Sequence, residues 1–193
     1  MPNWIPNIKE WKAIKARIRR LEEECQSVNI SSNLTDLLIV AEDHRFWMHP
    51  GCDPISLVRA FWKNVFLSRR EGASTIAMQL VRVISGRYEI CVIRKIVEIF
   101  LAIRITLLVD KSRLPRMYLL VAYYGWGMNG LKQASSRLEI DISSVSLIQA
   151  AEIIARLKYP EPQYPNISRL EKINIRASHI LKKYKPVSAS SCK

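Results

Sequence analysis

The stretch LLIVAEDHRFWMHPG, residues 37–51, joins an apolar run to a pair of carboxylates. Its first five residues predict a buried element, which follows turn and capping residues at 31–35 and ends directly at Glu42 and Asp43. An acidic pair in an apolar and aromatic setting can serve as a general base. For an isolated pair, a helix cap beside a solvated carboxylate explains the pattern better, so the rest of the chain has to decide.

Outward from this stretch, the sequence predicts helices almost everywhere. Asp53 and Pro54 predict an N-cap followed by proline at the first helical position, and the apolar residues after them predict a helix of about three turns. Ser74 is predicted to cap the helix that continues to Val83. Because alternating polar and apolar runs are nearly absent, the predicted fold class is mainly α. Further helical patterns cover roughly residues 90–109, 112–122, 145–157 and 168–184.

The helix predicted over residues 90–109 carries a charged face. Arg94 and Lys95 stand four and three residues before Glu98, so all three side chains share one side of an otherwise apolar helix. Charges in such a setting need partners or a function. A structural ion pair and an anion-binding site in a cleft are both compatible with this spacing.

Length and composition bound the class of function. The 193 residues fit one domain, which we place at 31–186, between an N-terminal segment at 1–30 and a flexible tail at 187–193. The net charge of +13 favours a polyanionic partner, which nucleic acid, an anionic bilayer surface or a phosphorylated substrate would provide. The four cysteines form no CxxC pair and have no metal-ligand spacing, so neither a metal site nor a redox motif is predicted.

The N-terminal segment combines apolar residues at helical spacing with interleaved lysines and arginines. This pattern predicts a basic amphipathic helix. Such a helix can lie in a bilayer interface or pack on its own domain, and the sequence does not choose between the two. No apolar stretch of the kind found in a signal peptide or a membrane-spanning helix is visible in the sequence.

Three motifs follow one another in the order found in a known enzyme family. Residues 42–51 match E-D-x-x-F-x-x-H-x-G, residues 72–79 match G-x-S-T-I-x-x-Q, and residues 94–98 match R-K-x-x-E. Residues 111–120 and 176–181 are similar to a fourth motif, K-x-x-I-L-x-x-Y-L-N, and a fifth, R-x-x-x-V-L. In this order and spacing the chain resembles the peptidoglycan glycosyltransferases of class A penicillin-binding proteins and monofunctional transglycosylases.

The resemblance implies a lysozyme-like helical domain with a smaller lobe that faces the membrane. It implies polymerisation of lipid II, in which the 4-hydroxyl of an incoming N-acetylglucosamine attacks C1 at the reducing end of the growing strand. Undecaprenyl pyrophosphate leaves with inversion, so the site needs a base beside the hydroxyl and cations beside the pyrophosphate. Lipid II, the glycan strand, the membrane surface and other cell-wall synthesis proteins are the implied partners. The implied location is the external, periplasmic face of the cytoplasmic membrane.

The family match assigns the site residue by residue. Glu42 is the implied general base. Glu98 completes the catalytic set by orienting the basic pair or a divalent cation, Mg²⁺ or Mn²⁺, although no cofactor or protein metal site is firmly implied. Asp43 is expected to order its loop, and Lys111 and Arg176 to brace the cleft. The full set implied in substrate binding is Asp43, Phe46, His49, Gly72, Ser74, Thr75, Gln79, Arg82, Arg94, Lys95, Lys111 and Arg176.

The chain departs from the family pattern in two respects. Leu120 stands where the fourth motif usually has asparagine, which predicts the loss of one polar partner in or behind the cleft. The N-terminal membrane helix that family members normally carry is also not visible. We therefore expect either that the anchor has been lost or that the natural chain begins further upstream.

Three other functions fit parts of the sequence. A lysozyme-like, glycan-cleaving enzyme would also use a single glutamate, but Arg94, Lys95 and Glu98 favour a pyrophosphate substrate. A degenerate homologue could bind a lipid-linked precursor or the membrane without catalysis, although the intact Glu42 and Glu98 count against it. A nucleic-acid-binding protein fits the charge alone, and because no recognised motif supports it, no nucleic-acid partner is predicted.

Overall fold

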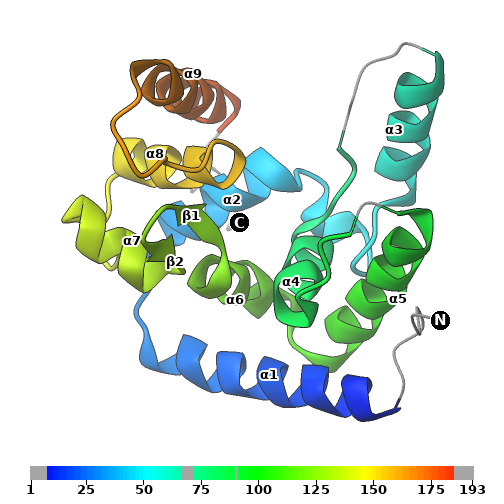
Figure 1. Ribbon diagram of the computed structural model, residues 1–193. Coiled ribbons are helices and arrows are strands. Elements are labelled where there is room, and N and C mark those ends of the chain that lie inside the picture. Colours follow the sequence, from blue (N-terminus) through cyan, green and yellow to red (C-terminus); the bar gives the residue numbers. More distant parts are fainter. Residues whose placement is uncertain (1–7, 67–71, 90, 185–193) are drawn as a thin grey trace, which may run out of the picture.

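The computed structural model describes residues 8–66, 72–89 and 91–184, and within these ranges the chain is mainly helical (Figure 1). The predicted fold class is therefore confirmed. Two short strands, β1 (Tyr123–Gly125) and β2 (Met128–Asn129), and two 3-10 turns, η1 (Phe46–Met48) and η2 (Lys111–Arg113), accompany the helices. The helices are α1 (Ile8–Ser27), α2 (Ser32–Glu42), α3 (Pro54–Phe66), α4 (Ile76–Ser85), α5 (Val92–Leu108), α6 (Leu114–Val121), α7 (Leu131–Leu138), α8 (Leu147–Lys158) and α9 (Ile167–Lys183).

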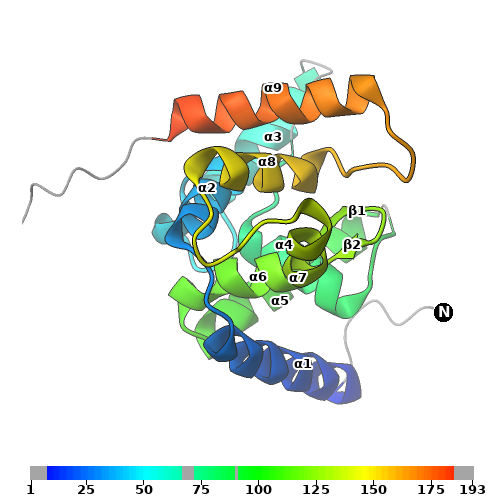
Figure 2. The ribbon, with the colours of Figure 1, turned by 90° about the vertical axis from the view of Figure 1, so that its left-hand side faces the viewer.

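The central helices α4 and α6 join the two halves of the molecule. Figures 1 and 2 show α8 and α9 stacked over α2 on one side of them, and α1 running along the opposite side. Contacts between α2 and α8, between α8 and α9, and from α4 to α5 and α6 connect the layers. Fully buried side chains such as Leu37, Leu80 and Leu101 lie in one continuous hydrophobic core. The helix α3 projects from this body (Figure 1).

The two predicted helix caps have different outcomes. Asp53 caps α3 as predicted, because its Oδ1 accepts the amide hydrogen of Ile55 at 3.1 Å. At α4 the prediction of Ser74 is wrong, since the hydroxyl of Thr75 accepts the amide hydrogen of Met78 at 3.2 Å. The hydroxyl of Ser74 instead accepts hydrogen bonds from charged side chains that come from α4 and α5.

The sequence prediction missed both strands and the helix α7. The strands β1 and β2 form an antiparallel hairpin in which Tyr123 pairs with Asn129 and Gly125 with Met128. They are too short, at three and two residues, for an alternating pattern to be visible. The helix α7 has only eight residues and lies below the length at which apolar periodicity is informative.

The N-terminal helix α1 packs on its own domain. Its apolar residues Ile14 and Ile18 are buried in the core, and ion pairs join Glu22 to Arg113 at 2.5 Å and Glu24 to Lys132 at 2.6 Å. The first residues of the basic segment lie outside the described residues. Of the two arrangements left open by the sequence, packing against the domain is the one observed. None of the helices in the described ranges is long and apolar enough to cross a membrane.

Candidate active site

A cleft of about 940 Å³ opens where α2 ends, between α3 and α4 on one side and α8 and α9 on the other. The helix α2 buries Leu37 and Leu38 in the core and ends at Glu42, which places this carboxylate on the cleft wall. The cleft is strongly basic. Its charged lining consists of Glu42, Arg59, Lys63, Arg82, Lys158, Arg176 and Lys183.

Two side chains hold the carboxylate of Glu42. Gln79 Nε2 donates to Oε2 at 3.1 Å, and Arg176 Nη2 donates to Oε1 at 3.3 Å and to the carbonyl oxygen of Ala41 at 2.9 Å. The hydroxyl of Tyr118 donates to Gln79 Oε1 at 2.6 Å, and burial raises the pKa of Tyr118 well above its ordinary value. Because Tyr118 stays protonated, the Gln79 amide turns its nitrogen toward Glu42.

Behind Glu42, a buried network joins the first two motifs. Asp43 Oδ1 lies 2.9 Å from His49 Nε2, and Asp43 Oδ2 accepts the amide hydrogen of Ile76 at 3.1 Å, at the start of α4. The amide of Gly51 donates to His49 Nδ1 at 3.2 Å, so Nε2 is the nitrogen that donates to Asp43. The hydroxyl of Thr75 donates to the carbonyl oxygen of Gly51 at 2.6 Å. These bonds fix the loop after Glu42 against α4.

The fourth motif and a glycine complete this support. Lys111 Nζ donates to the carbonyl oxygen of His49 and lies 5.0 Å from the ring centre of Phe46. Burial lowers the pKa of Lys111, although the nearby carboxylate of Asp43 opposes the shift. Gly51 has a φ of +101°, and a Cβ there would stand 2.6 Å from the carbonyl oxygen of Ala102. Only glycine fits where this loop meets α5.

The charged face predicted on α5 forms a cluster around Glu98, whose side chain is only 3% exposed. Arg82 Nη2 donates to Glu98 Oε1 at 2.8 Å and its Nε to Oε2 at 3.3 Å, while Arg94 and Lys95 contact the same carboxylate. Lys95 Nζ also donates to Ser74 Oγ at 2.8 Å. Burial lowers the pKa of Lys95, against the opposing charge of Glu98. Three cations surround one carboxylate, so the cluster keeps an excess of positive charge.

The implied site residues fall into two groups. The first group lines the cleft, and the second forms the two networks that support it. Arg82 belongs to the first and also contacts Glu98, so it links the cleft to the buried cluster. The cleft-lining group is Glu42, Gly72, Ser74, Gln79, Arg82 and Arg176. The supporting group is Asp43, Phe46, His49, Thr75, Arg94, Lys95, Glu98 and Lys111.

The sequence prediction missed four cations of the cleft lining and the exposed His44. Arg59 and Lys63 come from α3, where their spacing of four residues on the side opposite Val58 was an available signal. Lys158 and Lys183 come from the ends of α8 and α9, and no motif marks them. Their convergence depends on how the two helices pack.

Leu120 does not leave a gap in the cleft. Its side chain is buried in the hydrophobic core, and it is not among the residues that line the cleft. The carbonyl oxygen of Leu120 lies 2.3 Å from the position of a Cβ built on Gly130, whose φ is +91°. The expected loss of a polar group therefore does not affect the cleft lining, because this position packs among apolar side chains.

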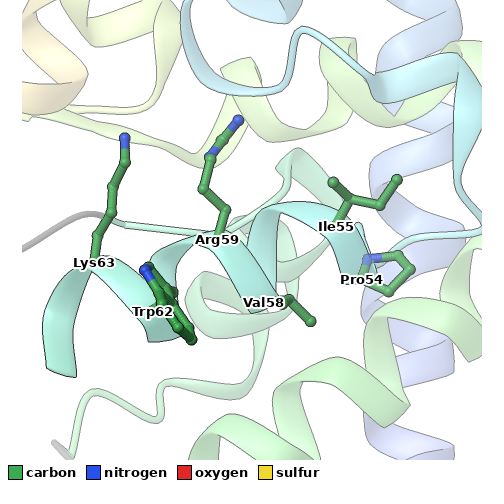
Figure 3. A pocket seen from close by; sticks show the side chains of 6 residues that line it. All are labelled: Pro54, Ile55, Val58, Arg59, Trp62 and Lys63. Carbon is green, nitrogen blue, oxygen red and sulfur yellow. The ribbon is translucent and has the colours of Figure 1, made fainter. Parts of the chain in front are cut away.

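A shallow apolar groove of about 560 Å³ lies along α3 (Figure 3). Figure 3 shows Arg59 and Lys63 pointing to one side of the helix and Val58 and Trp62 to the other. Val58 is 69% exposed and Trp62 is 59% exposed. The helix α3 thus presents cations to the cleft and exposed apolar side chains away from it. The neighbouring helix α5 also exposes large apolar side chains, namely Val92, Ile93, Ile96, Phe100, Leu107 and Leu108.

The surroundings of Glu98 do not fit a divalent cation. Both oxygens of Glu98 already accept hydrogen bonds from Arg82 and Arg94, and a third cation, Lys95, stands beside them. A Mg²⁺ or Mn²⁺ ion needs several oxygen ligands. Within the described ranges, no three His, Cys, Asp or Glu side chains come together as a metal-binding group.

The fold and the cleft define a mainly helical domain in which one carboxylate lies on the wall of a basic cleft. Comparison with known proteins gives the family. Residues 11–185 match the family model described as Transglycosylase. The chain belongs to this transglycosylase family, and the resemblance read from the five motifs is confirmed.

Relatives fall into two size classes. The chain is 36% identical over 149 residues to penicillin-binding protein 2a of Streptococcus pneumoniae, covering 77% of this chain and 20% of that protein. It is 29% identical over 160 residues to penicillin-binding protein 1A of Rickettsia prowazekii, again covering 20% of the relative. The biosynthetic peptidoglycan transglycosylase of Thiobacillus denitrificans is 32% identical over 157 residues, 67% of its length. The chain thus spans about a fifth of the penicillin-binding relatives.

Proposed function

We propose that this chain is a peptidoglycan glycosyltransferase that polymerises lipid II and releases undecaprenyl pyrophosphate with inversion. The observation that carries the proposal is the placement of Glu42 on a basic cleft, held by Gln79 and Arg176 at 3.1 and 3.3 Å. The family membership and the name of the Thiobacillus denitrificans relative support the same reaction.

In the proposed reaction, Glu42 takes the proton of the acceptor hydroxyl. Among the described residues, each oxygen of its carboxylate accepts one hydrogen bond, which leaves lone pairs for a substrate hydroxyl. As the proton moves to Glu42, the hydroxyl oxygen forms the new bond to C1 and the C1–pyrophosphate bond breaks. The Tyr118–Gln79 pair keeps the carboxylate oriented throughout, because its bonds do not depend on the substrate.

The leaving pyrophosphate needs cations more than it needs an acid. Arg82 lines the cleft, and its guanidinium is held by Glu98 and Ser74, so it is oriented before the substrate arrives. Lys95 adds charge from behind through Ser74. Lys63 on α3 adds a further positive charge to the lining of the cleft. We assign to these cations the stabilisation of the negative charge that develops on the leaving pyrophosphate.

The polyprenyl chain is proposed to enter beside α3, with the membrane as the surface that covers its apolar face. The same helix points Arg59 and Lys63 into the cleft, so a lipid along its groove would carry a pyrophosphate into contact with both. The exposed apolar residues of α5 extend this surface. The external face of the cytoplasmic membrane and contacts with other cell-wall synthesis proteins belong to the same proposal.

Polymerisation of labelled lipid II in detergent tests the function. We expect the chain to form glycan strands that are resolved on a gel, and the Glu42→Gln variant to form none. Release of short glycan fragments from preformed strands would instead identify a glycan-cleaving enzyme. A folded chain that binds lipid II without producing polymer would identify a binding protein.

A further inference from the structure

The hairpin formed by β1 and β2 holds an exposed tryptophan in a rigid turn. Trp126 lies between Gly125 and Gly127, which have φ values of +145° and +67°. The amide of Trp126 donates to the carbonyl oxygen of Glu161 at 2.8 Å, and the amide of Glu161 donates to the carbonyl oxygen of Tyr124 at 3.0 Å. A Cβ on Gly125 would lie 2.5 Å from the Glu161 backbone. The turn is therefore locked onto the segment that follows α8.

The exposed aromatic rings of this hairpin are supported from below. Trp126 is 49% exposed, and the guanidinium carbon of Arg137 lies 5.2 Å from its ring centre. A guanidinium against one part of the indole restrains the ring without covering it. Tyr123 is 50% exposed, whereas Tyr124 between them is fully buried and donates its hydroxyl to the carbonyl oxygen of Leu119. The core thus anchors the hairpin while two aromatic side chains face solvent.

A short segment connects this hairpin to the wall of the active-site cleft. Leu157 and Lys158 line the cleft at the end of α8, and Glu161 stands three residues after Lys158. Arg156 Nε donates to the Glu161 carboxylate at 2.7 Å, which fixes the segment between the cleft and the hairpin. Figures 1 and 2 show the hairpin close to the end of α8 and well separated from α3. The hairpin therefore lies beyond the end of α8, on the side of the molecule away from the proposed membrane surface.

We propose that Trp126, with Tyr123, is a saccharide-binding platform that holds the growing glycan strand beyond the cleft; this rests on the proposed function. Pyranose rings present apolar C–H faces with polar hydroxyls around them. A half-exposed indole beside a guanidinium offers a matching flat surface and a hydrogen-bond donor. A lipid chain fits less well, because the ring stands beside charged Arg137 instead of within an apolar patch such as the one on α3.

The first test measures binding of a soluble probe, the β-1,4-linked tetramer of N-acetylglucosamine, by isothermal titration calorimetry. We expect Trp126→Ala to weaken binding about tenfold, the change produced by losing roughly 1.4 kcal/mol. Trp126→Tyr should retain most of the affinity. Trp62→Ala is the matched control, because it removes a tryptophan of comparable exposure from α3, and it should bind the tetramer like the parent. Equal affinity in Trp126→Ala, or no binding by the parent, overturns the proposal.

The second test separates this proposal from the proposed function. In the lipid II assay, Trp126→Ala should yield shorter strands than the parent. Unchanged strand length, together with unchanged tetramer binding, would contradict the proposed platform and leave the proposed transferase activity standing. Tetramer binding that depends on Trp126, in a chain without polymerase activity, would support the platform and contradict the proposed transferase activity. Matching thermal unfolding curves establish that the variants are folded.

Discussion

Glu42 and Glu98 are both held by cationic side chains, yet their surroundings differ. Glu42 is 18% exposed and has one arginine partner, Arg176, beside the neutral amide of Gln79. Glu98 is 3% exposed and contacts three cations. The carboxylate of Glu42 retains access to the cleft, whereas both oxygens of Glu98 are bonded to cationic side chains of the protein.

This difference suits the two carboxylates to different roles, proton transfer for Glu42 and the positioning of cations for Glu98. A carboxylate that must take a proton needs free lone pairs and contact with substrate, and Glu42 meets both conditions. A carboxylate that keeps several cations close together needs burial and saturation, which describes Glu98. The expectation that Glu98 belongs to the catalytic set therefore becomes a proposal about positioning, because it acts through Arg82 and Lys95.

The largest predicted effect is on the rate of the Glu42→Gln variant. Loss of a general base costs at least about 100-fold in polymerisation rate. The glutamine side chain has the same shape and can still accept from Arg176, so the unfolding temperature should stay close to that of the parent. Timed lipid II assays and calorimetric melting curves measure the two quantities. A large drop in unfolding temperature would place Glu42 with the structural carboxylates.

Glu98→Gln should show the opposite balance. Removing one partner of a buried ion pair costs about 3 kcal/mol or more, and here three cations lose their shared counter-charge. For a chain of this size the unfolding temperature should fall by several degrees, at roughly 2–4 °C per kcal/mol. Differential scanning calorimetry checks this. Should Glu98→Gln melt like the parent while Glu42→Gln does not, the contrast between the two carboxylates would be reversed.

A smaller effect is expected at the start of α4. Thr75→Ala removes both the cap on Met78 and the bond to Gly51, and should lower the free energy of unfolding by about 1–2 kcal/mol. Ser74→Ala is the control, since Ser74 caps no helix and its donors, Arg82 and Lys95, keep Glu98. Urea unfolding compares the two. Equal losses would mean that the hydroxyl contacts of Ser74 are as structural as the Thr75 cap.

The sequence identified what depends on local spacing. The cap at Asp53, the shared face of Arg94 and Glu98, and the carboxylate at the end of α2 all follow from residues within a few positions of one another. The order of the motifs then indicated the family. Assigning the α4 cap to Ser74 failed because the two neighbouring hydroxyls are equivalent in sequence, and only the charges around Ser74 distinguish them.

What the sequence could not predict depends on contacts between distant segments. Arg176 reaches Glu42 across 134 positions, and Lys158 and Lys183 join the cleft only because α8 and α9 pack together. The hairpin around Trp126 was invisible for a different reason, since its strands are too short to show a period. A resemblance can transfer the role of Arg176, but residues outside the motifs require the fold.

The smallest predicted effect concerns a third carboxylate, Asp53, whose contribution to stability depends on pH. Burial raises the pKa of Asp53, but hydrogen bonds from Ser56 and Ile55 and the charge of Arg45 outweigh it, so the pKa lies below its ordinary value of 3.8. Its stabilisation is then fully present above pH 3.8 and is lost as the pH falls through the lowered pKa. Asp53→Asn should cost up to about 1 kcal/mol at pH 7 and progressively less below pH 3.8. The free energy of unfolding of the parent and of Asp53→Asn, measured at pH 7 and below pH 3.8, tests this. A difference between the two proteins that is the same at both pH values would show that the charge of Asp53 contributes nothing beyond its capping hydrogen bonds.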